Sequence, residues 1–152
     1  MLITNLAVAS VLVVLTFASH FWGLVVLTSI LRKRKSHPAN ITSVAGQGMS
    51  IVFVVLGLFA LHSAQIWVYA LVYLFLGEFQ TMEPALYFST SAFTTVGFGE
   101  IVLSEDWRML SAAESANGFL LIGWSTAFLV SVTAKVRAFE ADIERLDDET
   151  DD

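Results

Sequence analysis

Three long apolar stretches set the hydropathy pattern of the chain. Residues 1–31 contain no Asp, Glu, Lys or Arg, residues 36–77 contain none either, and 20 residues between Glu114 and Lys135 are again uncharged. About 20 apolar residues cross a bilayer as an α-helix. The first stretch would reach only about 45 Å as one helix, which is too short to cross twice. The pattern predicts three transmembrane helices, at about 3–31, 49–76 and 107–134.

A shorter apolar segment, Pro84–Phe93, lies between the second and third stretches, after the polar connection Glu78–Glu83. Proline suits the first turn of a helix, because its missing N–H would have no partner there. Ten helical residues rise only about 15 Å, so this segment cannot cross a bilayer. We predict a short helix at 84–93 that does not span.

Composition agrees with a membrane protein and excludes several functions. Of 152 residues, 14% are charged, against about 25% in a soluble domain. The chain has no cysteine, which excludes disulfides and cysteine-ligated metals. A net charge of −6 is opposite to the basic charge that nucleic-acid-binding proteins carry. With no nucleophile elbow and no phosphate-binding glycine loop, we expect an all-α membrane protein that is not an enzyme and needs no cofactor.

The charged residues are sorted by side of the membrane. Arg32–Lys35 directly follows the first span, whereas a cleavable signal peptide carries its positive charge before the apolar core. Seven of the eight Lys and Arg fall on the side of this basic run, and only Arg108 falls on the other. The positive-inside rule therefore predicts an outside N-terminus and a cytoplasmic C-terminus. We expect the basic run to set topology; binding of anionic lipid headgroups is the alternative.

The most specific motif, Thr94-Thr95-Val96-Gly97-Phe98-Gly99, follows the short helix. It resembles the selectivity filter of the potassium channel pore-domain family, which usually reads Thr-Val-Gly-Tyr-Gly, with Phe in place of Tyr in some members. A dehydrated cation needs stacked rings of backbone carbonyls that point at one axis. Aligning successive carbonyls requires residues that accept φ > 0, which explains Gly97 and Gly99.

This resemblance implies both a fold and a function. The short helix becomes a re-entrant pore helix, loop 94–99 becomes a filter, and 36–134 becomes a pore domain of outer helix, pore loop and inner helix. Because one loop supplies a quarter of each oxygen ring, the resemblance implies a homotetramer that conducts K⁺ passively. The permeant K⁺ would be coordinated by the Thr95 hydroxyl and by the carbonyls of Thr95, Val96, Gly97 and Phe98.

Further residues around the filter follow from the same resemblance. Glu100 stands where the family usually has Asp, and an acidic ring there would concentrate cations at the mouth; a merely solvated carboxylate is the alternative. Tyr87 and Phe88 occupy positions where the family often has an aromatic cuff around the filter. Phe98 lacks the hydroxyl that would tie filter to cuff, which removes one source of filter rigidity.

Glu114 is an acidic residue inside the third apolar stretch. Along a helix it lies about 9 Å below Arg108, a depth that places it behind the filter, near Ser89 or Ser91 of the pore helix. An intramembrane carboxylate is costly unless it is hydrogen-bonded. We hypothesise that Glu114 bonds to the pore helix or filter backbone and stabilises the filter, with Ser91 as a second support. An interfacial Glu in contact with water is the alternative.

Small and polar residues within the spans each have two interpretations. Gly118, near the family's hinge position, or Gly123 would bend during gating, or either would only permit close helix packing. His62 and Gln65 are three residues apart and therefore share a helix face, while His20 lies in the first span. We expect these three side chains to form interhelical hydrogen bonds rather than a functional site or a pH sensor.

Two segments lie outside the pore unit: residues 1–35, the first helix with its basic turn, and residues 135–152, an acidic tail. In the tail, Val136, Phe139, Ile143 and Leu146 have the 3-4-3 spacing of a coiled coil over only about one and a half heptads. A short tetrameric extension and a helix on the membrane surface both remain open. We expect 147–152 to be disordered.

The favoured function is a potassium-selective channel in a plasma membrane of bacterial type, with K⁺, membrane lipid and further copies of itself as partners. A weakly selective cation channel, a transporter subunit, and a non-conducting membrane adaptor with a vestigial filter are the alternatives. Transporters of the related loop type usually join four loops in one chain and keep one filter glycine. This chain has one loop and keeps both Gly97 and Gly99.

Overall fold

The computed structural model describes residues 2–35 and 44–150. This part of the chain folds into four helices and no strand: α1 (Leu2–Lys35), α2 (Val44–Phe75), α3 (Met82–Phe93) and α4 (Arg108–Thr150). Three of them contain stretches long and apolar enough to cross a membrane, Leu2–Lys33, Gly48–Phe75 and Arg108–Ala134. The prediction of an all-α membrane protein with three spans and one short additional helix is therefore confirmed.

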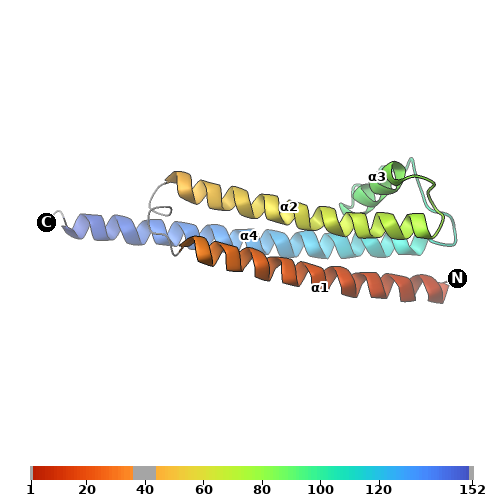
Figure 1. Ribbon diagram of the computed structural model, residues 1–152, viewed down its shortest axis with the longest axis horizontal. Helices are drawn as coiled ribbons and strands as arrows, with labels where there is room; N and C mark the ends of the chain where they lie inside the picture. Colours follow the sequence, from red (N-terminus) through yellow and green to blue (C-terminus); the bar gives the residue numbers. More distant parts are fainter. Residues whose placement is uncertain (1, 36–43, 151–152) are drawn as a thin grey trace.

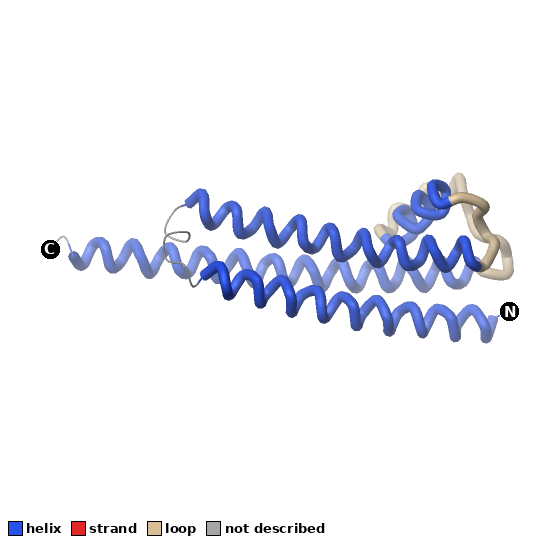
Figure 2. The backbone as a smooth tube through the Cα atoms, viewed as in Figure 1, coloured by secondary structure: helices blue, strands red, loops and turns tan. Residues whose placement is uncertain are grey.

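The three long helices lie side by side, and α3 is attached at one end of the bundle (Figures 1 and 2). The chain leaves α2 at that end, enters α3, and returns through a loop to the same end before α4 begins. The segment between α2 and α4 is thus re-entrant, as predicted. The N-terminus lies at the end that carries α3, and the C-terminus lies at the opposite end (Figure 1).

Helix α4 is longer than its predicted membrane span. The span was expected to end near Ala134 and residues 147–152 to be disordered, but the helical backbone continues to Thr150. The reason is that residues 135–150 contain neither Gly nor Pro, and half of them are Ala, Glu, Arg or Leu, which favour helix. The predicted coiled-coil side chains of the tail lie outside the described residues.

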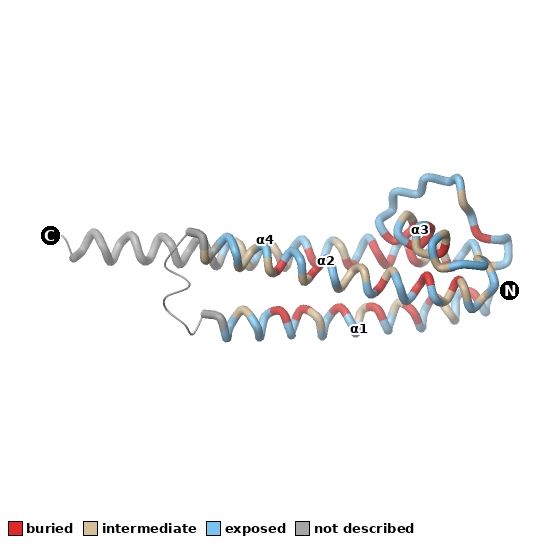
Figure 3. Tube along the Cα trace, turned by 45° about the horizontal axis from the view of Figure 1, so that its top comes forward, coloured by how far each residue is buried: buried red, intermediate tan, exposed pale blue. Residues whose placement is uncertain are grey.

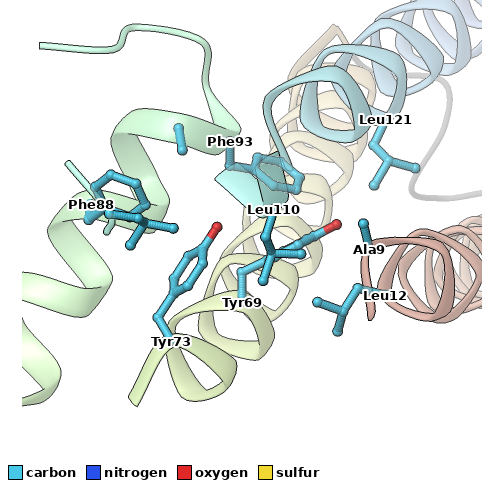
Figure 4. Packing of buried hydrophobic residues seen from close by; sticks show 10 residues of the cluster. Ala9, Leu12, Tyr69, Tyr73, Phe88, Phe93, Leu110 and Leu121 are labelled. Carbon is cyan, nitrogen blue, oxygen red and sulfur yellow. The ribbon is translucent and has the colours of Figure 1, made fainter. Parts of the chain in front are cut away.

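Two apolar clusters hold the bundle together. At the end that carries α3, Tyr69 and Tyr73 of α2 pack between the aromatic residues of α3 and Ala9 and Leu12 of α1 (Figure 4). Further along, α1 and α2 pack together with α4 in a second cluster, whose buried members are Leu24, Leu27, Val54 and Leu58. Helix α1 therefore packs against the other helices along much of its length.

The opposite faces of the long helices remain exposed in the single chain (Figure 3). Phe59 is 73% exposed, Val14 67% and Trp22 65%. Large apolar side chains in this position are ordinary for a membrane protein, because lipid or further protein covers them.

Candidate functional site

The backbone of the motif after α3 alternates in handedness. Thr94 caps the helix with φ −80° and ψ 0°, and positive φ angles follow at every second residue: 61° at Thr95, 57° at Gly97 and 82° at Gly99. Such alternation turns successive carbonyls toward one side, as coordination of a cation by backbone oxygens requires. Positive φ was predicted at the two glycines. At Thr95 it was missed, because β-branched residues rarely adopt this conformation.

Ser91 of α3 fastens the middle of this loop. Its carbonyl accepts a hydrogen bond from the Gly97 N–H at 3.2 Å, and its hydroxyl accepts one from the Phe98 N–H at 3.2 Å. The start of the loop is held by the Thr95 N–H, which donates to the Ala92 carbonyl at 3.0 Å. The structure thus places Ser91 in direct contact with the backbone it was proposed to support.

Tyr87 lies against the outer end of the loop. Its ring stacks on Phe98, with centroids 6.1 Å apart and planes inclined by 16°, and its hydroxyl donates to the Glu100 carboxylate. That hydrogen bond raises the pKa of the Tyr87 phenol, because a deprotonated phenol could no longer donate to the Glu100 carboxylate. Phe98 has no hydroxyl to tie the loop to α3, and the hydrogen bond between Tyr87 and Glu100, two residues later, makes that connection instead.

Phe88, the second residue of the predicted aromatic cuff, packs in another direction. Its ring meets Tyr73 at 5.3 Å and Phe79 at 5.5 Å, so it anchors α3 to α2 (Figure 4). Of the two aromatic residues, Tyr87 stacks on the loop and Phe88 holds the helix that carries it.

Glu114 of α4 is completely buried behind α3. One carboxylate oxygen accepts a hydrogen bond from the Ser89 hydroxyl and the other from the Tyr73 hydroxyl, both at 2.5 Å. The Ser89 hydroxyl also lies 3.0 Å from the Ile66 carbonyl. Glu114 therefore joins α2, α3 and α4 at the depth that helix geometry predicted, and it does so through Ser89 rather than Ser91.

Tyr69 and Tyr73 of α2 are both fully buried, and their hydroxyls have partners on other helices. The Tyr73 hydroxyl is used by Glu114, and the Tyr69 hydroxyl accepts from the Asn117 amide at 3.0 Å.

The two candidate hinge glycines lie in different surroundings. A Cβ on Gly118 would lie 2.0 Å from the Phe93 carbonyl oxygen, whereas a Cβ on Gly123 would meet nothing within 4 Å. Gly118 is therefore needed for the close approach of α4 to the last residue of α3. Bending at either glycine stays a prediction.

The polar residues in the spans do form interhelical hydrogen bonds. His62 bonds to Gln65 on the same face of α2, and Gln65 reaches His20 of α1. Sequence reasoning missed Asn117, whose amide also donates to Thr16 at 2.8 Å. The available signal was its position three residues after Glu114, on the same face of an otherwise apolar helix.

The connections around the site are also fastened. Both oxygens of Glu78 accept from Ser104, from its N–H and its hydroxyl, each at 2.7 Å, which joins the segment before α3 to the segment before α4. The Asn5 amide of α1 donates to the Asp106 carbonyl. Within the described residues, no group of three or more His, Asp or Glu side chains could hold a metal ion.

A re-entrant helix and an alternating loop between two membrane-spanning helices define a pore-loop membrane protein. A model of the ion channel family matches residues 58–135, just over half of the chain, and the chain belongs to that family. The match includes most of α2, all of α3 and the loop, and the apolar part of α4, while α1 lies outside it. No curated protein and no solved structure matches the chain.

Proposed function

We propose that the protein is a potassium-selective channel that conducts K⁺ passively through a homotetrameric pore. The observation that carries this proposal is the alternation of positive φ at Thr95, Gly97 and Gly99 in a loop that reads Thr-Val-Gly-Phe-Gly. Carbonyls of residues 95–98 and the Thr95 hydroxyl replace the hydration shell of K⁺, and adjacent sites let one ion displace the next.

Fourfold assembly follows from what one chain lacks. A single loop supplies one oxygen to each coordination layer, and four symmetric copies close the ring. Val96 and Phe98, apolar residues of the loop, are 54% and 63% exposed in the single chain. Neighbouring copies would cover these side chains, whose exposure to water around a filter would be unfavourable.

The charges around the loop suit a cation. The C-terminal end of α3 carries partial negative charge from unpaired carbonyls, and Glu100 follows the filter at its mouth. With the N-terminus outside and the basic run in the cytoplasm, the loop faces the outer solution of a plasma membrane. Glu114 and Ser91 support the filter from behind.

The decisive test compares two glycines with the same backbone requirement. Gly97 and Gly77 both have positive φ, 57° and 77°, and a Cβ on either would meet nothing within 4 Å. Alanine at either position therefore strains the backbone similarly, but only Gly97 lies in the filter. In liposomes with a K⁺ gradient, wild type and Gly77→Ala are expected to pass K⁺, and Gly97→Ala is expected to lose K⁺ flux or its preference over Na⁺.

The other outcomes identify the alternatives. Equal Na⁺ and K⁺ permeability in wild type would contradict selectivity and point to a weakly selective cation channel. Absence of any ion flux through correctly assembled wild type would contradict conduction and leave a membrane adaptor with a vestigial filter.

A further inference from the structure

Four polar side chains form a closed ring of hydrogen-bonding distances in the middle of the three-helix bundle. His20 Nδ1 lies 3.3 Å from Gln65 Nε2, and Gln65 Oε1 lies 3.2 Å from His62 Nδ1. His62 Nε2 lies 2.9 Å from the Ser125 hydroxyl, which lies 3.3 Å from His20 Nε2. His20, Gln65 and Ser125 are buried and His62 is half-buried. The ring joins α1, α2 and α4.

The chemistry of these groups fixes the direction of every bond in the ring. The Gln65 amide nitrogen can only donate, so His20 Nδ1 accepts and the proton of His20 is on Nε2. That N–H donates to Ser125, whose own hydroxyl proton then goes to His62 Nε2. His62 carries its proton on Nδ1 and donates it to Gln65 Oε1. With the Gln65 amide in this orientation, all four bonds form only when Nδ1 of His20 carries no proton.

One additional proton breaks this pattern. A doubly protonated His20 would turn an Nδ1–H toward the Gln65 amide hydrogens, whereas a doubly protonated His62 keeps its partner, because the Ser125 hydroxyl can rotate and accept from both imidazoles. Protonation of His20 therefore removes an acceptor from the ring and places a positive charge inside an apolar bundle, where charge is costly.

The surroundings offer no compensating negative charge nearby. Helix α1 has no charged residue before Arg32 and α2 has none at all. From α4 the facing acid is Glu114, 11 residues or about 16 Å from Ser125 along the helix, with both oxygens occupied by Ser89 and Tyr73. The rest of the shell is aromatic: Trp124 lies 5.2 Å from the His20 ring and Phe93 of α3 lies 5.7 Å from the His62 ring. Tyr69, a further titratable group four residues after Gln65 on α2, accepts from Asn117.

The position of the ring connects a helix outside the family match to a helix inside it. His20 belongs to α1, which precedes residues 58–135, whereas Ser125 belongs to α4, the inner helix of the proposed pore. Any event that opens the ring changes how α1 holds α4. Hydrogen bonds between polar side chains are directional contacts between membrane helices. Apolar side chains are less selective, because they pack against lipid as well as against another helix.

We propose that the ring of His20, Gln65, His62 and Ser125 is a proton-sensitive latch that holds the first helix against the pore-lining helix and that opens when His20 is protonated. The latch regulates conduction, so this part of the inference rests on the proposed channel function. Acidification that protonates His20 releases α4 from α1 and shifts the balance between conducting and non-conducting states.

Trp124 supplies a readout that does not depend on conduction, because an imidazolium beside an indole quenches its fluorescence. The full chain in liposomes is titrated from about pH 8 to about pH 3, which continues below the usual range of histidine into conditions that protonate an imidazole in an apolar site. Tryptophan emission and K⁺ flux are measured on the same samples. Trp124→Phe identifies the share of the emission that belongs to this residue among the four tryptophans.

Three variants separate the ring from general acid effects. His20→Gln removes a titrating member, Ser125→Ala breaks the ring but keeps both histidines, and Ser63→Ala is the matched control, because Ser63 is half-buried like His62 and its hydroxyl donates to the Phe59 carbonyl of its own helix. We expect wild type and Ser63→Ala to quench on acidification and to change flux by at least about fivefold, the lower end of typical coupling between sites. His20→Gln and Ser125→Ala should lose this flux response.

Two results would overturn the latch: Trp124 emission that does not change with pH, or a flux response to pH that is the same in His20→Gln, in His62→Gln and in wild type. If wild type passes no ion at all, the channel proposal fails. The Trp124 titration then still decides whether the ring takes up a proton.

Discussion

At the scale of single residues, the carboxylate of Glu114 has the largest predicted consequence. It is fully buried, and it is the common acceptor for one hydroxyl from the outer helix and one from the pore helix. Removing an acceptor from a buried hydroxyl costs about 1–3 kcal/mol. Because Ser89 retains the Ile66 carbonyl as a second partner, the donor left without an acceptor in Glu114→Ala is Tyr73.

Glu114→Ala is therefore expected to lower tetramer stability by about 1–3 kcal/mol and to make K⁺ conduction decay faster in sustained recordings. Glu114→Gln is expected to have a smaller effect in the same direction, because its amide keeps one acceptor and turns a donor toward a second hydroxyl. Thermal unfolding and current decay measure the two effects. Glu105→Gln is the control, since that side chain is 93% exposed. Unchanged conductance, selectivity and inactivation of Glu114→Gln at all pH values would end the filter-support hypothesis.

At the scale of elements, the contact between α3 and α4 determines where the pore helix ends. Gly118 allows the Phe93 carbonyl to approach α4 so closely that any side chain would overlap it. The obstacle is backbone at the end of α3 that leads into the loop at residues 94–99, so it cannot move aside without moving that loop.

Gly118→Ala is expected to destabilise the assembly by about 1–3 kcal/mol, the usual range for overpacking, and to impair K⁺ flux. Gly123→Ala adds the same methyl group to the same helix in open space and serves as the matched control. Tetramer yield after heating and liposome flux check both variants. Equal behaviour of the two alanine variants would show that the close approach at Gly118 is not required.

Element positions could be predicted from the sequence because charge-free stretches and Pro84 mark them directly. Positive φ at Gly97 and Gly99 was predictable for the same local reason. Thr95, Tyr73 and Ser125 were not, since their roles depend on contacts with other segments. The backbone of Thr95 is strained against its own preference, and the hydroxyls of Tyr73 and Ser125 have partners up to 105 residues away.

At the scale of the whole molecule, the prediction concerns the number of chains in the assembly. A homotetramer is expected to have four times the chain mass of 16.7 kDa, which native mass spectrometry or mass photometry of the detergent-solubilised protein would measure. A uniform dimer or monomer would contradict a pore built from one loop per chain. The Gly77→Ala variant should retain the tetramer.

The unbroken course of α4 has a mechanical consequence. The helix runs from Arg108 to Thr150 without interruption, and at Gly118 it lies against the last residue of α3. When α4 stays straight at Gly123, the segment from a fulcrum at Gly118 to Thr150 forms an arm of about 48 Å. A tilt of about 5° at the fulcrum would move the far end by about 4 Å, given the length of that arm. Force applied to the acidic tail would therefore be transmitted, with leverage, to the end of the pore helix.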